Sequence, residues 1–291
     1  MSVPTLTIFA NFRIDQEERF MRMQDSFLSF KDICAQHWVI NVRGSYKEKV
    51  HSFLATYLEN RLEISFLESK AGWFRDTREI MSGCTSEFVL FWIEDHINMV
   101  PVEVYQTVLK ELSQAQCDIL SYSFYHPETL KPYHYVSGDP FSTLTAYTLT
   151  KSAVCEIERQ LGGVFHIVSA LSILKTSVFK KIINSTHPLL KKWPKYLPFD
   201  FEKTSDAKQF LPLITAVPRL ELFASIDAGP TEAYSLIGRG LYPNRMDRAS
   251  LHEIEFKPKK YKIKSFIPPQ IWEKARQIYK VFLRLKYTLN I

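Results

Sequence analysis

The chain has 291 residues, of which 46% are hydrophobic and 23% are charged, and its formal net charge at pH 7 is +6. This apolar content supports a folded core and excludes a chain that is disordered throughout, and no window approaches 18 uninterrupted apolar residues. The positive charge is concentrated at one end, since residues 257–291 hold ten bases and one acid whereas residues 1–256 hold 27 bases and 30 acids. That distribution argues against a protein that coats nucleic acid, in which basic residues would line a groove of the fold.

Residues 5–124 repeat one pattern, in which a short apolar run is followed by an amphipathic stretch with helical spacing. Strands that alternate with helices in this way need right-handed connections. They predict a mainly parallel sheet that is covered on both faces and binds ligands at the carboxyl ends of its strands. The predicted strands are 5–9, 38–42, 62–67, 88–93 and 118–124, and the predicted helices are 15–33, 47–58, 73–81 and 102–112.

Polar side chains follow the first four predicted strands. Because the carboxyl ends of parallel strands meet at one edge of a sheet, we expect these side chains to form one polar rim. The alternative for each of them is a simple cap where a strand meets water. The residues are Asn11 and Arg13 after the first strand, Asn41 and Arg43 after the second, Lys70 after the third, and Glu94, Asp95 and His96 after the fourth.

The sharpest motif is FVLFWIEDHI at residues 88–97. A run this apolar predicts a central strand that is buried on both faces of the sheet. Two adjacent carboxylates and an imidazole at its end need cationic neighbours or a metal, because charged groups are costly to desolvate. Carboxylate oxygens and imidazole nitrogens suit Mg²⁺ or Mn²⁺ that bridges a diphosphate. The alternative is a set of surface acids that pair with nearby arginines.

Beyond residue 126 the alternation is less regular. Residues 133–149 predict paired strands or an insertion, with a turn at Gly138-Asp139-Pro140. Residues 151–161 predict a helix that the following glycine pair ends, and residues 177–183 predict a basic helix. The chain shows no internal repeat and no low-complexity linker, so we expect no second independent domain.

The order of strands and helices, with an acidic motif that closes the fourth strand near residue 95, resembles a GT-A glycosyltransferase of the broad family 2 type over about residues 4–205. The resemblance implies a Rossmann-like α/β domain that binds a nucleotide-sugar at the predicted rim. It also implies that the acidic motif binds ribose and a divalent metal. The residues implied in nucleotide-sugar binding are Asn11, Arg13, Asn41, Arg43, Lys70, Arg75, Arg78 and Glu94, and those implied in binding Mn²⁺ or Mg²⁺ are Asp95 and His96.

One residue of the acidic motif departs from the family's pattern. His96 stands where an aspartate is usual, so the metal coordination stays open. Three alternatives remain: Asp95 as the ligand, Asp95 together with His96, or an enzyme that works without metal.

The family also has a strand of small residues and a basic helix before a loop that carries the general base. Residues 169–182, followed by PFDFEK at 198–203, match this order and imply that Asp200 or Glu202 is the base. An inverting transfer needs such a carboxylate within reach of the acceptor hydroxyl. The alternative is an ordinary helix start, with Asp200 as its N-cap.

Residues 257–291 form a basic amphipathic tail. A helix predicted from Pro269 onward places apolar residues on one face and Arg276, Lys280 and Arg284 on another. This pattern favours binding to the headgroups of an anionic membrane. A helix packed on its own domain is the alternative.

These features predict a GT-A-like catalytic domain over residues 1–256, with a nucleotide-binding half at about 1–125 and an acceptor half at about 126–256, followed by the tail at 257–291. The expected function is an inverting transfer of a sugar from a nucleotide-diphosphate donor to a glycan or lipid-linked acceptor in bacterial cell-surface polysaccharide synthesis. Four separated cysteines and an early acidic segment favour the cytoplasm, and the basic tail favours a peripheral position on the inner face of the membrane. The alternative is a catalytically inactive GT-A-like binding or scaffold module at a membrane surface.

Overall fold

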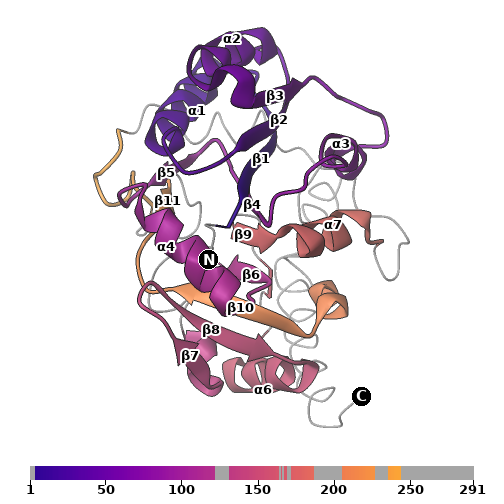
Figure 1. Cartoon of the computed structure of the whole chain (residues 1–291), viewed down its shortest axis with the longest axis vertical. Helices are drawn as coiled ribbons and strands as arrows, with labels where there is room; N and C mark the ends of the chain where they lie inside the picture. Colours follow the sequence, from indigo (N-terminus) through magenta and orange to yellow (C-terminus); the bar gives the residue numbers. More distant parts are fainter. Residues whose placement is uncertain are drawn as a thin grey trace, which may run out of the picture.

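The computed structural model describes residues 4–121, 131–163, 165, 167–168, 172–186, 205–226 and 235–243. The predictions for Asp200, Glu202 and residues 257–291 lie outside these ranges and stay predictions. Within the ranges the chain forms a nine-stranded sheet with helices on both faces and a two-stranded sheet beside it (Figure 1).

The large sheet has the strand order β3-β2-β1-β4-β9-β6-β10-β8-β7. Its strands are β1 (Leu6–Arg13), β2 (His37–Arg43), β3 (Leu62–Ser65), β4 (Phe88–Phe91), β6 (Ile119–Ser121), β7 (Gly138–Pro140), β8 (Leu144–Leu149), β9 (Ser172–Lys175) and β10 (Leu213–Pro218). The small sheet pairs β5 (His96–Asn98) with β11 (Phe223–Ser225). The helices are α1 (Glu17–Phe30), α2 (Lys47–Leu58), α3 (Trp73–Ile80), α4 (Val104–Gln114), α6 (Lys151–Leu161) and α7 (Thr176–Asn184), with 3₁₀ helices η1 (Glu59–Arg61), η2 (Lys131–Tyr135) and η4 (Ser205–Phe210). None of the helices in the described ranges is both long enough and apolar enough to cross a membrane.

Most strands of the large sheet run in one direction. β1 pairs in parallel with β2 and β4, and β2 pairs in parallel with β3, whereas β8 and β9 run against the other strands. This arrangement confirms the predicted α/β class with a mainly parallel sheet. The antiparallel β9 lies between β4 and β6, so the strand predicted at 118–124 does not adjoin the fourth strand.

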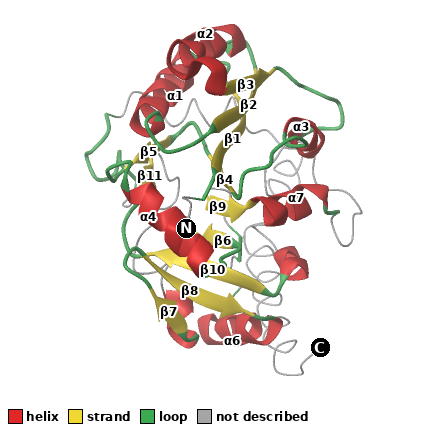
Figure 2. Ribbon diagram, in the orientation of Figure 1, coloured by secondary structure: helices red, strands yellow, loops and turns green. Residues whose placement is uncertain are grey.

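The sheet separates two apolar clusters. Leu6 and Ile8 of β1 pack with α1, α2 and α4 on one face, and Phe9 packs with α3, α6 and α7 on the other. Figure 2 shows helices on both sides of the sheet. Every residue of β1 before Arg13 is buried, as an apolar strand covered on both faces requires.

Several element ends differ from their predicted positions. The fourth strand ends at Phe91, and the acidic motif forms a turn between β4 and β5, where His96 begins a new strand. The segment predicted as a turn at Gly138 is the edge strand β7, and its tight pairing suits glycine, because a Cβ at Gly138 would lie 2.5 Å from the Tyr147 ring. The helix predicted at 151–161 is confirmed, and Gly162 ends it with a φ of 63°.

Glu111 of α4 forms hydrogen bonds with the turn that precedes β8. Its buried carboxylate accepts hydrogen bonds from the backbone N–H groups of Ser142 and Thr143, at 3.0 and 2.9 Å, and from the hydroxyl groups of both residues. Burial raises the pKa of Glu111, but these hydrogen bonds outweigh burial and hold the pKa below its ordinary value of 4.5. The ionised carboxylate therefore stabilises the fold above about pH 4.5, and this contribution is lost as the pH falls through the lowered pKa.

The variant Glu111→Gln is expected to lower the free energy of unfolding by about 2 kcal/mol at neutral pH, since an acceptor that bonds four donors is replaced by an amide. At about pH 3 the loss is expected to be smaller, because below pH 4.5 the unfolded chain takes up a proton at Glu111 and the contribution of the lowered pKa shrinks. Urea titrations of both proteins at the two pH values measure the difference. An equal loss at both values would contradict the assignment.

Candidate active site

A pocket of about 220 Å³ opens at the carboxyl ends of β1, β2 and β4. It lies where the strand order reverses, since β2 and β3 follow on one side of β1 and β4 lies on the other. Crevices at such a reversal are where open α/β sheets bind their ligands. Five of the predicted site residues contribute to its wall. The lining residues are Asn11, Phe12, Arg13, Arg19, Arg43, Phe91, Trp92, Ile93, Glu94 and Asp95.

Two buried amides brace the inner wall of the pocket. Asn41 donates from Nδ2 to Asn11 Oδ1 at 3.0 Å and to the carbonyl of Leu67 at 2.8 Å, and its Oδ1 accepts from the Leu67 N–H at 2.7 Å. Asn11 donates to Thr77 Oγ1 of α3 at 3.0 Å, and its carbonyl accepts from the Trp73 indole at 3.0 Å. These contacts tie the ends of β1 and β2 to the loop after β3 and to α3, so the amides shape the site through the backbone they hold.

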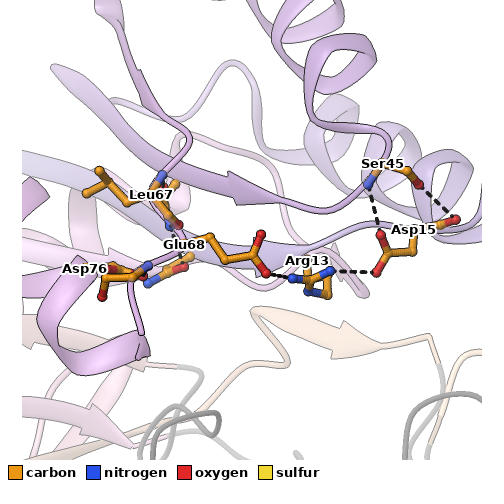
Figure 3. A network of polar contacts seen from close by, with 9 residues as sticks. Arg13, Asp15, Ser45, Leu67, Glu68 and Asp76 are labelled. Atoms are coloured by element: carbon orange, nitrogen blue, oxygen red, sulfur yellow. Dashed lines mark hydrogen bonds and ion pairs between the residues drawn. The ribbon is translucent and has the colours of Figure 1, made fainter. Parts of the chain in front are cut away.

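Arg13 lies at the mouth of the pocket, in register with Arg43 of the neighbouring strand. Its guanidinium pairs with Asp15 at 3.2 Å and, more closely, with Glu68 (Figure 3). Asp15 accepts a further hydrogen bond from the Ser45 backbone N–H at 2.9 Å. These exposed carboxylates hold Arg13 in place.

Arg43 is a partly buried cation in the pocket wall. Its Nε is buried and has no hydrogen-bond partner among the described residues. Desolvation lowers the pKa of Arg43, and the like charge of Arg13 lowers it further, although Asp76 and Glu94 act in the opposite direction. A desolvated guanidinium in a pocket wall, beside a second arginine, is suited to an anion.

Glu94 forms a buried ion pair with Arg19 of α1, and both residues line the pocket. Glu94 is 4% exposed, and the Arg19 side chain is 29% exposed and contributes to the pocket wall. Burial lowers the pKa of Arg19, but Glu94 and Asp95 outweigh it and raise the pKa above its ordinary value. The Arg19 charge is thus permanent and directed at the pocket.

Arg19 was missed by sequence reasoning, although a signal was present. Arg19, Arg22, Ser26 and Ser29 follow one another at spacings of three and four, which places them in one stripe along α1. That stripe packs on the acidic turn. Ser26 Oγ accepts from the Trp92 indole at 2.8 Å and donates to the His96 carbonyl, and Ser29 Oγ accepts from the Asn98 N–H at 2.9 Å.

Asp95 and His96 form a hydrogen-bonded pair, with 2.6 Å between His96 Nδ1 and Asp95 Oδ1. The Asp95 side chain is 38% exposed and the His96 side chain 10%. Partial desolvation opposes ionisation of Asp95, but His96, Arg19 and Arg22 outweigh it and hold its pKa below the ordinary value. Within the described part of the chain, no group of three or more His, Cys, Asp or Glu side chains is arranged to hold a metal ion. The metal-binding roles of Asp95 and His96 stay predictions.

The predicted basic segment lies outside the wall of this pocket. Lys70 and Arg75 are exposed, in the loop before α3 and on α3. Arg78 donates from Nη1 to the carbonyl of Ile183 at 3.1 Å and so links α3 to α7. None of these three residues is among the described residues that line the pocket, so their roles in binding stay predictions.

No family model and no curated protein matches this chain. Among solved structures it is similar to S. aureus TarS 1–349, with 14% identity over 73% of this chain and 57% of that one and a TM-score of 0.46. The complex of that fragment with UDP-GlcNAc gives 13% identity over 73% and 55% of the two chains and a TM-score of 0.44, and the complex with UDP gives 12% over 95% and 78% and a TM-score of 0.48. This chain thus spans little more than half of the first two structures. At these identities and TM-scores the similarities carry no information on activity, so the function is inferred from the pocket itself.

Proposed function

We propose that this chain is an inverting glycosyltransferase, which transfers a sugar from a nucleoside diphosphate donor to a glycan or lipid-linked acceptor in cell-surface polysaccharide synthesis. The observation that carries the proposal is the pocket where the strand order reverses, with Arg13, Arg19 and Arg43 in its wall. A diphosphate is strongly anionic, and guanidinium groups bind phosphate oxygens through paired, charge-assisted hydrogen bonds. A nucleotide with two phosphates is therefore the ligand that fits this wall.

In the proposed reaction the acceptor hydroxyl attacks the anomeric carbon from the side opposite the diphosphate. The bond between that carbon and the diphosphate oxygen breaks, its electron pair moves onto the oxygen, and the acceptor proton passes to a carboxylate base. Arginines placed around the departing oxygen stabilise the charge that develops there. Asp200 and Glu202 are the proposed candidates for the base.

Titration calorimetry of the full chain with sugar nucleotides of different bases tests the proposal. One class of nucleotide is expected to bind, and its diphosphate is expected to bind more tightly than its monophosphate, because the second phosphate adds contacts with arginine. For variants in which a pocket arginine is replaced, Arg159→Met is the matched control, because Arg159 pairs with Glu156 on the exposed side of α6. The absence of binding for every nucleotide, with and without Mn²⁺, would refute the proposal.

A nucleotide-binding module without catalytic activity is the second candidate. The observation that favours it is the acidic turn, where Glu94 pairs with Arg19 and Asp95 with His96. Such a module would bind the nucleotide but would neither transfer nor hydrolyse the donor. An assay for release of free sugar from the preferred donor separates the two candidates, since only a catalytic site could transfer the sugar to water in place of the acceptor.

A further inference from the structure

The acidic turn between β4 and β5 is built around a cation of the chain itself. Glu94 is almost fully buried and its carboxylate faces the guanidinium of Arg19, 75 residues earlier in the sequence. A buried carboxylate without a cation is strongly unfavourable, so the two side chains hold each other in place. The same pair fixes the position of Arg19 at the pocket wall.

The acidic turn offers a divalent metal few donors. Mg²⁺ and Mn²⁺ take oxygen ligands in near-octahedral geometry, and Glu94 already faces a guanidinium. His96 Nδ1 lies 2.6 Å from Asp95 Oδ1, and this contact occupies one oxygen of the Asp95 carboxylate. Asp95 is then the one carboxylate of the turn that is left to bind an ion.

The charges around the pocket also disfavour a divalent metal. Its wall contains three guanidinium groups and two carboxylates, and a metal ion would enter beside Arg13, Arg19 and Arg43. Arg13 and Arg19 are paired with carboxylates, but the buried Nε of Arg43 has no hydrogen-bond partner among the described residues. This guanidinium disfavours a cation beside it and favours a diphosphate. The arginines thus supply the positive charge that a metal would otherwise bring.

We propose that Arg19, positioned by Glu94, binds the diphosphate of the donor in place of a metal ion, so that the site works without a divalent cation. The inference rests on the proposed function, because it concerns how the same pocket neutralises the leaving group. When the bond to the anomeric carbon breaks, the electron pair on the departing oxygen is stabilised by a guanidinium whose position needs no metal to define it.

Binding of nucleoside diphosphate to the full chain in EDTA and in Mn²⁺ tests the absence of a metal requirement. Equal affinity in the two conditions is expected, and the electron paramagnetic resonance signal of free Mn²⁺ is expected not to fall when protein and nucleotide are added. Binding that is lost in EDTA and restored by Mn²⁺ would overturn the inference while leaving the proposed function intact. Failure to bind any nucleotide in either condition would instead refute the proposed function.

Substitution of Arg19 tests its direct contact with phosphate. Arg19→Met is expected to weaken binding of the nucleoside diphosphate by about tenfold or more, and Arg19→Lys is expected to retain part of the affinity because it keeps the charge. Binding of the corresponding nucleoside, which has no phosphate, is expected to stay unchanged in both variants. That pattern would not arise from a general disturbance of the pocket.

Arg22→Met is the matched control. Arg22 is a buried arginine of the same helix face that pairs with Glu18 at 3.1 Å and does not line the pocket. Its loss is expected to reduce stability but to leave the affinity for the diphosphate unchanged. If Arg22→Met and Arg19→Met weakened diphosphate and nucleoside binding alike, Arg19 would have a structural role only and the inference would fail.

Discussion

Replacement of Arg43 by methionine is expected to change stability and binding in opposite directions. The free energy of unfolding is expected to rise by about 1 kcal/mol, because the variant removes a buried Nε that has no hydrogen-bond partner among the described residues. Burial and the neighbouring Arg13 hold the pKa of Arg43 below its ordinary value, so the folded chain disfavours this charge. Methionine keeps most of the apolar stem and therefore its packing.

The same variant is expected to weaken nucleoside diphosphate binding by about tenfold or more, because an anion in the pocket provides the missing partner of the guanidinium. Denaturant titrations measure the first effect and calorimetry the second. Arg159→Met, which removes an exposed arginine paired with Glu156, is expected to change neither quantity appreciably. A less stable Arg43→Met protein with unchanged affinity would show that Arg43 serves the fold and not the ligand.

Alanine at the residue that serves as the base is expected to have the largest effect on transfer. Removal of a general base costs about 10²- to 10⁴-fold in rate, so one of the variants Asp200→Ala and Glu202→Ala should lose transfer almost completely. Its affinity for the nucleotide should stay the same, because the base acts on the acceptor hydroxyl and not on the diphosphate. Initial rates of sugar transfer and calorimetry with the preferred nucleotide measure the two properties.

The two single variants serve as controls for each other. If Asp200 is only the N-cap of a helix, Asp200→Ala should lower stability by about 1 kcal/mol and leave the rate within a small factor of wild type. Full transfer activity in both variants would rule out both residues as the base. Loss of nucleotide binding in either variant would place that residue in the donor pocket instead.

Much of the nucleotide-binding half could be predicted from local pattern. α2 and α6 have the bounds that the sequence predicts, and β1, β2 and β4 begin within one residue of the predicted positions. Such elements depend on side-chain spacing along a few turns or one strand, which is visible without knowledge of the partners. The polar residues after these strands were predicted to meet at one edge, and Asn11, Arg13, Arg43, Glu94 and Asp95 do line one pocket there.

The pairing between distant elements could not be predicted in the same way. β9 inserts antiparallel between β4 and β6. The local pairing of β7 with β8 agrees with the paired strands predicted as one alternative for residues 133–149, although Gly138 lies in a strand and not in the turn. The pairing of β9 leaves no periodic signal, because its partners β4 and β6 come from segments far from it in the sequence. Asn41 illustrates the same limit for side chains, since its amide bonds the Leu67 backbone and Asn11 across three segments.

The sequence by itself determined that a mainly parallel α/β sheet forms, because alternating apolar and amphipathic segments specify its strands and helices. It also determined that cations, amides and carboxylates lie at the carboxyl ends of these strands, because those residues directly follow the apolar runs. The tertiary structure alone decided which charges meet. Glu94 is paired with an arginine of α1 and Asp95 with His96, and Arg43 is left with a buried Nε without a partner among the described residues. The physical reason is desolvation: a buried charge takes the partner that the packing of distant helices and strands brings within reach, and no local spacing encodes that choice.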